Sequence, residues 1–477
     1  MESPVAKSPR SPEAEIGHRL EDLWDVQEPQ LSPSEKLNSC FQDLPVSSFP
    51  PAPSSEGSPF RHRTFLFSSL LFAPNPKLIV FAQRIIYMKK FSSFVFFLVI
   101  EISSDATLSA AVEILSKHKI LSALVRNVDA PEDASWIDRY IGIVEFPGIA
   151  VWLLHQSEVS VLRMKAASAV TGFEVSELAE VTKIGGTDAA SEDVAGVAAA
   201  TGPANFVPEA VDSTGGGFFE TLTSSDFYKN TMVKEIAGSF RWAPFLAIEN
   251  SDSFLTMLLL LSKYRMKSLP VVDLGAGKIE NIITQSAVVH MLAECVDLHW
   301  FENWGSKKLY ELGLPAMKPK GLIKVSEHQP VLKAFQLMRE KGIGGLPVVD
   351  QSGNKAIGNI SIRDVQYLLT APEIYNDYRS ITAKNFLTAV RNHLVEHEEA
   401  SPMLHGVIKC NRNDTLQDVI LRLDTEKIHR IYVVDEEENL QGVITLRDII
   451  SKLVHEPHRY FGDFFDGFVP LPANSRV

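Results

Sequence analysis

The sequence is poor in cysteine. Its 477 residues include three, Cys40, Cys295 and Cys410, which lie far apart and are odd in number. This pattern excludes a disulfide-stabilised scaffold and the closely spaced cysteine pairs of a zinc site. We therefore expect free thiols in a reducing compartment, which means the cytoplasm or the nucleus.

An excess of positive charge and any signature of catalysis are also missing. The net charge is -13, whereas a nucleic-acid surface needs concentrated Lys and Arg, so we expect no nucleic acid among the partners. The Gly-rich loop, the HRD followed by Asn and the DFG triplet of a protein kinase are absent, and no spacing suggests a Ser/His/Asp arrangement. The first residues carry no apolar core of a secretory signal. We expect a protein that is not an enzyme.

No residue pattern predicts a metal site. The histidines that come nearest to one are His393, His397, His455 and His458. They stand in a loop-like context without a cysteine or a clear carboxylate partner, so we expect surface histidines rather than metal ligands.

Residues 49–98 differ sharply from the rest of the chain. Nine of the 27 phenylalanines lie between Phe60 and Phe97, and residues 61–100 contain six Lys or Arg but no Asp or Glu. Proline and basic residues interrupt the apolar runs, so each is shorter than the roughly 20 residues that a transmembrane helix needs. We do not expect integral membrane insertion. A basic amphipathic surface anchor stays open, and an inserted stretch from an alternative transcript or gene model is the interpretation we favour.

Four segments repeat one pattern of a strand, an amphipathic helix, a strand ending in Asp or Asn, another strand and a second helix. The clearest copy contains GGLPVVD followed by GNISIRD, and the next contains HRIYVVD followed by GVITLRD. The final aspartates, Asp364 and Asp448, are 84 residues apart. One unit of about 55 residues buries too little apolar surface to be stable alone. We therefore expect an α/β fold of four units, with units one and two forming one pair and units three and four the other.

The composition between the repeats divides the chain into ten segments. In chain order these are a mostly disordered N-terminal tail (1–48), the atypical basic Phe-rich insertion (49–98), unit one (99–156), a flexible linker (157–227), unit two (228–298), an inter-module linker (299–317), unit three (318–372), a connector (373–404), unit four (405–460) and an aromatic C-terminal tail (461–477). The N-terminal tail contains one helical pattern over 13–26 and Ser-Pro pairs at Ser3, Ser8, Ser11 and Ser32. We expect the inter-module linker to pack where the two pairs meet and the aromatic tail to cover the last sheet.

These motifs resemble cystathionine-beta-synthase (CBS) repeats, four of which form two Bateman modules. More narrowly, GGLPVVD with GNISIRD, HRIYVVD with GVITLRD and the linker ENWGSKKLYELGL are similar to the gamma subunits of the AMP-activated and sucrose-non-fermenting type protein kinases, including the plant gamma-like proteins. The resemblance covers residues 99–454. It implies a non-catalytic regulatory subunit that assembles with a kinase catalytic subunit and a beta-type scaffold subunit. It also implies that AMP, ADP or ATP binds as a regulatory ligand, with no cofactor required.

The resemblance also implies which residues contact a nucleotide. In the family, a Ser or Thr followed three residues later by Asp stands where the second strand meets the second helix, and the ionised Asp accepts the ribose hydroxyls. The candidates in units three and four are Ser361, Asp364, Thr445, Asp448, His429 and Arg430, the last two as cations that face phosphate. Unit two is weaker, because it has Thr284 and Lys267 but Ala287 in place of the Asp. We expect at most two sites, both in the C-terminal pair, and the stretch from 428 to 450 is the most complete.

The same residues also fit a purely structural role. Ser-x-x-Asp or Thr-x-x-Asp before an apolar helix is a capping box, which stabilises a helix by about 1 kcal/mol. Arg363 and Arg447 fit solvated residues at a helix start better than ligands. If the polar residues only cap helices, the protein is an interaction scaffold without nucleotide sensing. The sequence leaves both interpretations open.

Overall fold

The computed structural model describes residues 11–50, 100–152, 226–236, 246–370 and 380–462, apart from short gaps at 119, 121, 132–133, 135, 147, 150–151, 265, 276–277 and 318. Nearly all of the insertion 49–98, nearly all of the linker 157–227 and most of the tail 461–477 lie outside the described residues. The interpretations offered for the insertion and the linker are therefore not tested by the structure.

Each of the four units contains a three-stranded sheet, in which the first two strands are parallel and the last two antiparallel. In units one and two the strands are β1 (Glu101–Ser103), β2 (Ser122–Arg126), β3 (Tyr140–Glu145), β4 (Ile248–Glu249), β5 (Ser268–Asp273) and β6 (Lys278–Thr284). In units three and four they are β7 (Val325–Ser326), β8 (Gly345–Val349), β9 (Ala356–Ser361), β10 (Lys409–Asn411), β11 (Arg430–Val434) and β12 (Leu440–Thr445). The predicted α/β fold of four repeated units is confirmed.

A helix connects the two parallel strands of every unit, because parallel neighbours need a crossover. These helices are α4 (Leu108–Lys117), α10 (Phe254–Ser262), α13 (Val331–Lys341) and α17 (Leu416–Thr425). The apolar residues that predicted α17 form its buried face, and Thr415 caps its first turn by accepting from the Asp418 N–H at 3.2 Å. Helix α13 ends at Gly342, whose φ of 61° is a left-handed conformation that favours glycine. Local sequence therefore sets both the face and the ends of these helices.

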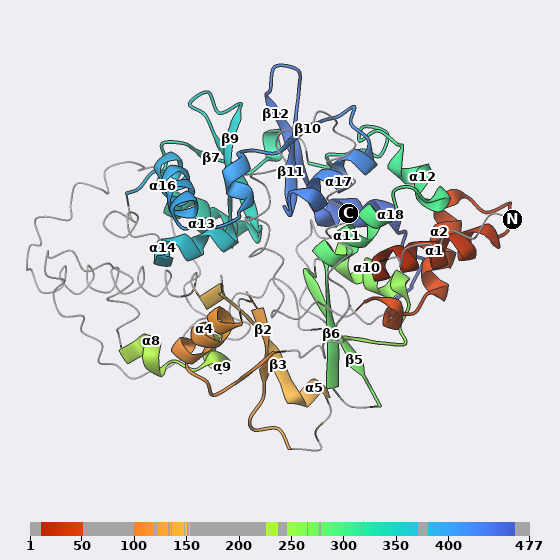
Figure 1. Ribbon diagram of the computed structural model, residues 1–477, viewed down its shortest axis with the longest axis horizontal. Helices are drawn as coiled ribbons and strands as arrows, with labels where there is room; N and C mark the ends of the chain where they lie inside the picture. Colours follow the sequence, from red (N-terminus) through yellow and green to blue (C-terminus); the bar gives the residue numbers. More distant parts are fainter. Residues whose placement is uncertain are drawn as a thin grey trace, which may run out of the picture.

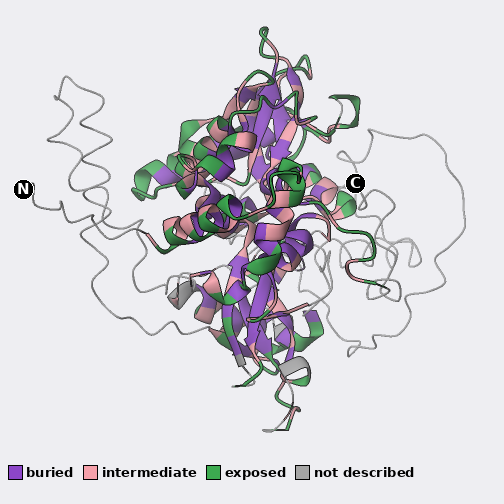
Figure 2. Ribbon diagram, turned by 90° about the vertical axis from the view of Figure 1, so that its right-hand side faces the viewer, coloured by how far each residue is buried: buried purple, intermediate pink, exposed green. Residues whose placement is uncertain are grey.

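Two apolar contacts between sheets pair the units as predicted. Leu124 and Tyr140 of unit one pack with Val272 and Ile279 of unit two. The equivalent contact between units three and four contains Val349, Ala356, Tyr432 and Leu440. The first pair forms the lower half of Figure 1 and the second pair the upper half. The strands are largely buried and the helices are exposed on their outer sides (Figure 2).

Units two and four share one hydrophobic core, so the two pairs pack against each other. Helices α10 and α11 (Gln285–Glu294) of unit two pack against α17 and α18 (Leu446–Leu453) of unit four. Helix α12 (His299–Gly305), in the inter-module linker, buries Trp300, Phe301 and Trp304 in the same core. Trp304 also donates from Nε1 to the Lys452 carbonyl at 3.2 Å. The expectation that this linker packs where the pairs meet is confirmed.

The N-terminal segment corrects the expectation of a mostly disordered tail over 1–48. Residues 1–10 lie outside the described residues, but α1 (Pro12–Asp25) and α2 (Pro33–Asp43) are regular helices (red in Figure 1). The helix predicted over 13–26 is confirmed, whereas α2 was missed. Leu20 and Phe41 are fully buried in the core shared by units two and four, and burying such a side chain stabilises a fold by about 1.5–3 kcal/mol. The apolar stripe of each helix therefore explains why this segment is ordered.

Each unit is completed by a short segment that lies outside its predicted boundaries. This segment pairs with the residue just before the crossover helix of the unit. The isolated bridges are Thr107 with Met232, Pro45 with Ser253, Pro330 with Thr382, and Lys308 with Thr415. Helix α9 (Val233–Ile236), assigned to unit two, therefore packs on unit one, and α16 (Ala383–Glu396), assigned to the connector, packs on unit three. Residues 44–46 complete unit two although they precede unit one in the chain. The boundaries of the units therefore differ from the predicted 228–298 and 373–404. The sequence did not reveal this difference, because pairing between distant segments leaves no local signal.

The remaining described elements are short. They are η1 (Val46–Ser48), α5 (Trp136–Arg139), α8 (Asp226–Asn230), η3 (Pro319–Gly321), η4 (Ile362–Gln366), α14 (Tyr367–Thr370) and η5 (Pro402–His405). The start of the aromatic tail packs on unit two rather than on the last sheet, since the ring of Phe461 lies 5.2 Å from that of Tyr264. In the part of the chain that the structure describes, every helix is too short or too polar to cross a membrane.

Candidate functional site

Asp364 is the buried carboxylate of the candidate site. It lies in η4, directly after β9, and is 7% exposed. Its Oδ2 accepts from the Ser361 N–H at 2.7 Å, as part of a capping box. Burial raises the pKa of Asp364, while the bonds to Ser361 and the positive charges of Arg430 and Arg363 act in the opposite direction. A ligand that donates hydrogen bonds to this carboxylate would favour its ionised form.

Arg430 reaches across the C-terminal pair, from the first residue of β11 in unit four to unit three. Its Nη1 lies 3.4 Å from Asn359 Oδ1, and the same oxygen accepts from the Tyr432 hydroxyl at 2.6 Å. The guanidinium occupies the space beside Gly344 and Gly345: a Cβ at Gly345 would collide with it, and a Cβ at Gly344 would lie 3.3 Å from Arg430 Nη2. The paired glycines of unit three therefore admit the cation of unit four, because they carry no side chain.

Three further basic residues lie near Arg430 and come from units two, three and four. Burial and the positive charges of Arg363, Arg430 and Lys267 lower the pKa of His429 to about 4. The His429 Nε2 lies 3.1 Å from Ser286 Oγ of unit two. Burial and Arg430 also lower the pKa of Lys267, and Glu145 of unit one opposes them. Lys267, Arg363 and His429 remain accessible to water. The arrangement is a basic surface, and a bound anion would reduce the repulsion between its positive charges. We call Lys267, Arg363, His429 and Arg430 the central basic cluster.

Thr445 and Asp448 form a capping box at the start of α18. Asp448 Oδ2 accepts from the Thr445 N–H at 2.8 Å and from its hydroxyl at 2.6 Å, and Thr445 Oγ1 accepts from the Asp448 N–H at 3.4 Å. Thr284 caps α11 in the same way, with Oγ1 accepting from the Ala287 N–H at 3.1 Å. The structural role that the sequence left open is thus present at both positions, and ligand contact there stays a prediction.

The structure redistributes the stretch that the sequence favoured as one site. His429 and Arg430 stand in the same unit as Thr445 and Asp448, and Arg430 is the register partner of Thr445. The charge and contacts of Arg430 nevertheless reach Asp364 and Asn359 of unit three. The reason is the packing of the two sheets, which brings the start of β11 near the end of β9. A pairing between units cannot be read from one repeat.

Sequence reasoning missed three residues of this site. Arg363 was assigned to a solvated helix start, yet its charge acts on both Asp364 and His429. Asn359 and Tyr432 lie outside the Ser-x-x-Asp and Thr-x-x-Asp motifs. A signal for both exists, because alternate residues of a strand share a face. Asn359 lies two residues before Ser361, and Tyr432 lies two residues after Arg430.

The expectation of surface histidines is wrong for His393. Its side chain is 6% exposed, its ring centroid lies 4.1 Å from that of His397, and its Nδ1 has no hydrogen-bond partner among the described residues. Helix α16 packs on unit three, which buries this position. Among the residues described, no group of three or more potential ligands could hold a metal ion.

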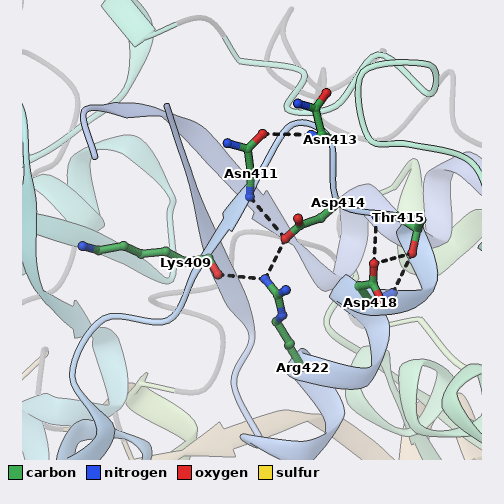
Figure 3. A network of polar contacts seen from close by, with 7 residues as sticks. All are labelled: Lys409, Asn411, Asn413, Asp414, Thr415, Asp418 and Arg422. Atoms are coloured by element: carbon green, nitrogen blue, oxygen red, sulfur yellow. Dashed lines mark hydrogen bonds and ion pairs between the residues drawn. The ribbon is translucent and has the colours of Figure 1, made fainter. Parts of the chain in front are cut away.

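A second depression lies on the rim of unit four. This cavity of about 540 Å³ is lined by Tyr310, Asn411, Arg412, Asn413, Val434, Asp435, Glu436 and Gln441. Beside it, Arg422 donates from Nη1 to Asp414 at 2.7 Å and to the Lys409 carbonyl at 3.1 Å (Figure 3). Asp435 in turn accepts from Asn439 in the turn and from Gln441 of β12. These polar groups satisfy one another and hold the rim of the sheet, so they indicate structure rather than a ligand site.

Comparison with known proteins gives a consistent set of relatives. The family model for the CBS domain matches residues 317–370 and 398–455. The SNF1-related protein kinase regulatory subunit gamma-1 of Arabidopsis thaliana is 55% identical over 468 residues, which cover 98% of this chain and 95% of that protein. The 5'-AMP-activated protein kinase subunit gamma-3 of Sus scrofa is 30% identical over 222 residues, covering 46% and 40%. The crystal structure of protein MJ1225 from Methanocaldococcus jannaschii aligns at 13% identity with a TM-score of 0.46, covering 74% of this chain and 96% of that chain. The CBS model matches units three and four, which are the more regular repeats.

Proposed function

The chain belongs to the family of SNF1-related protein kinase regulatory gamma subunits, and we propose that it senses adenine nucleotides between units three and four. AMP, ADP or ATP would act as a regulatory ligand of a kinase complex, and the chain itself would be non-catalytic. The relative from Sus scrofa carries AMP activation in its name, which supports the nucleotide class.

One observation carries this proposal. Arg363 and Arg430 of the central basic cluster act on Asp364, and the other two members, Lys267 and His429, lie near these cations. A carboxylate beside several cations matches a nucleotide, whose ribose donates hydrogen bonds and whose phosphates carry negative charge. A phosphate bound here would reduce the repulsion that Arg363, Arg430 and Lys267 exert on the charged form of His429.

The chemistry of binding assigns a role to each group. Asp364 would accept the ribose hydroxyls, and Arg430 would turn from Asn359 toward a phosphate. His429 would gain a proton as phosphate approaches, because a nearby negative charge favours the charged imidazole. Charge-assisted hydrogen bonds of this kind contribute about 1.5–3 kcal/mol each. Ser361 would keep the carboxylate in place through the capping box.

Regulation would follow from where the cluster lies. Lys267 belongs to unit two, whereas the other cations belong to units three and four, so a phosphate held by all of them links the two pairs. Units two and four already share a core. A nucleotide can shift the equilibrium between two arrangements of the pairs by at most the difference in its binding free energy to them. This difference limits its effect on the kinase.

Calorimetric titration of the full chain with AMP, ADP and ATP tests the proposal. We expect saturable heat, at most two sites, and mutual competition. The variant Asp364→Asn should weaken binding at least tenfold, and Asp448→Asn shows whether the second carboxylate takes part. A melting curve of each variant checks the capping boxes. The absence of heat and of competition with all three nucleotides would leave the interaction scaffold as the function.

We also propose that the chain assembles with a kinase catalytic subunit and a beta-type scaffold subunit. Cys40, Cys295 and Cys410 are buried free thiols, which agrees with a reducing compartment such as the cytoplasm or the nucleus. Affinity capture with the folded full chain from plant extract should recover a kinase catalytic chain. Failure to recover one would remove the subunit assignment while leaving nucleotide binding to the titration.

A further inference from the structure

Ser11 joins the start of α1 to the end of α11. Its Oγ accepts from the Ala14 N–H at 3.1 Å, which caps α1, and donates to Glu294 Oε2 at 3.1 Å. Glu294 is the last residue of α11. Through this contact, a hydroxyl on the N-terminal segment holds a carboxylate of unit two, 283 residues away in the chain.

Ser32 has the same local structure without the distant contact. Both serines are N-caps in an extended conformation, with φ and ψ of -65° and 151° at Ser11 and of -62° and 155° at Ser32. Each is followed by a proline at the first helical position. The Ser32 hydroxyl donates to Glu35 in its own helix at 2.6 Å. Ser32 is therefore a matched reference for any effect that depends on Glu294.

We propose that Ser11 is a phosphorylation site for a proline-directed Ser/Thr kinase, and that the phosphate loosens α1 from unit two. Ser11 Oγ would form a bond to the γ-phosphorus of ATP, the bond to the bridging oxygen would break, and ADP would leave. The hydroxyl proton would pass to a base of that kinase. This inference does not depend on nucleotide sensing.

The first turn of α1 can open to admit such an enzyme. The first buried residue of the helix is Ile16, and none of residues 11–15 is buried. Helix ends that bury little surface fray at small cost. Unfolding one turn would therefore expose the Ser-Pro pair in an extended form while Leu20 and Trp24 stay packed.

The phosphate would then replace an attraction by a repulsion. It carries a charge of about -2 at pH 7 and would face the Glu294 carboxylate and the negative end of the α11 dipole. The phosphate would also attract the free N–H groups at the start of α1. This attraction stabilises the helix itself but does not hold it against α11. At Ser32 the like charge of Glu35 belongs to the same helix, so the docking of α1 should not change.

Cys295 reports the docking of α1. Its Sγ lies 2.6 Å from the position that a Cβ would take at Gly17 of α1, and the side chain is fully buried. Burial raises the pKa of this thiol to about 12, so it reacts slowly in the docked state. Trp300 donates from Nε1 to the Gly17 carbonyl at 3.1 Å at the same contact. Loosening of α1 would open a path to the thiol.

The experiment uses two full-length variants that each retain a single N-terminal Ser-Pro pair. One carries alanine at positions 3, 8 and 32 and keeps Ser11, and the other carries alanine at positions 3, 8 and 11 and keeps Ser32. Each is treated with a mitogen-activated protein kinase and ATP, and the phosphorylated residue is identified by peptide mass, because Ser58-Pro59 and Ser401-Pro402 remain in both variants. Thiol labelling is then resolved by peptide mass. We expect phosphorylated Ser11 to speed labelling of Cys295 about tenfold at low salt, with Cys410 unchanged as an internal control.

Two further observations separate this electrostatic effect from general unfolding. The acceleration should shrink in 0.5 M NaCl, because salt screens exposed charges. It should also shrink when Glu294→Gln is added to the Ser11 variant, since that change removes the facing charge and keeps a polar partner. Absence of phosphate on Ser11, or equal acceleration by phosphorylated Ser32, or an effect that survives Glu294→Gln, would overturn the proposal.

Discussion

The guanidinium of Arg430 in unit four lies against Asn359 in unit three, with 3.4 Å between Nη1 and Oδ1. The Tyr432 hydroxyl donates to the same Asn359 oxygen at 2.6 Å. Arg430, at the start of β11, is thus fixed by β9, the last strand of the neighbouring unit. This contact holds one of the two cations that act on Asp364; the other is Arg363.

Replacement of Arg430 by alanine should weaken nucleotide binding by about 10- to 100-fold, the value of one desolvated charge-assisted hydrogen bond. Calorimetric titration with AMP measures the change. Arg447→Ala is the control, because Arg447 is another arginine of unit four and is not part of the central basic cluster. Equal losses in the two variants would contradict a specific role for Arg430.

The variant Gly345→Ala should expel the Arg430 side chain from its present position. The added Cβ would collide with the guanidinium and would lie 2.8 Å from the Ile360 carbonyl oxygen, which belongs to the backbone and cannot move easily. We expect a loss of about 1–3 kcal/mol in the free energy of unfolding, measured by denaturant titration. Gly344→Ala should cost less, since the nearest atom there is Arg430 Nη2 at 3.3 Å.

Nucleotide binding should be accompanied by proton uptake on His429. The pKa of this residue is about 4 in the free protein, because burial and three cations disfavour its charged form. A phosphate in the cluster would raise that pKa, so protons are taken up between pH 5 and pH 7. Titration at pH 6 in two buffers of different ionisation enthalpy measures the uptake, and His429→Gln should abolish it. Binding without uptake would show that phosphate does not reach His429.

The contact between His290 of unit two and Asp424 of unit four should make stability depend on pH. Their side chains lie 3.1 Å apart, and the bond to Asp424 raises the pKa of His290. A raised pKa in the folded state means that this stabilisation is complete below pH 6.5 and is lost as pH rises through the folded value. The free energy of unfolding of the wild type should therefore exceed that of His290→Gln by roughly 1 kcal/mol at pH 6 and by little at pH 8.5. A difference that is constant with pH would exclude the charged pair.

The N-terminal helices should stabilise the fold through a cap that Glu21 provides to α12. Its carboxylate accepts from the His299 N–H at 3.1 Å and from the Trp300 N–H at 3.3 Å. Glu21→Ala should lower the free energy of unfolding by about 1 kcal/mol, the usual value of a helix cap. Glu15→Ala on the same helix removes only an exposed ion pair with Arg19 and should change stability very little. Thermal melting of both variants measures the contrast.

Local patterns were enough to predict the repeats and part of the site. The apolar spacing of Leu416, Val419, Ile420 and Leu423 predicted a helix and its buried face, both of which the structure contains. The position of Asp364 after its strand predicted a carboxylate at the strand end. The pairing of units into two modules followed from the small core of one unit. These features depend on neighbours in the chain, so composition and spacing reveal them.

Contacts between distant segments could not be predicted in the same way. Nothing near residues 44–46 indicates that they complete unit two, because the pairing with Ser253 depends on how the N-terminal helices pack. Nothing in one repeat shows that Arg430 reaches Asn359, or that Lys267 of another unit lies near. The sequence by itself determined the repeated unit, its helices and its candidate polar residues. The tertiary structure alone decided which cation faces which carboxylate, because that depends on how two buried sheets pack against each other.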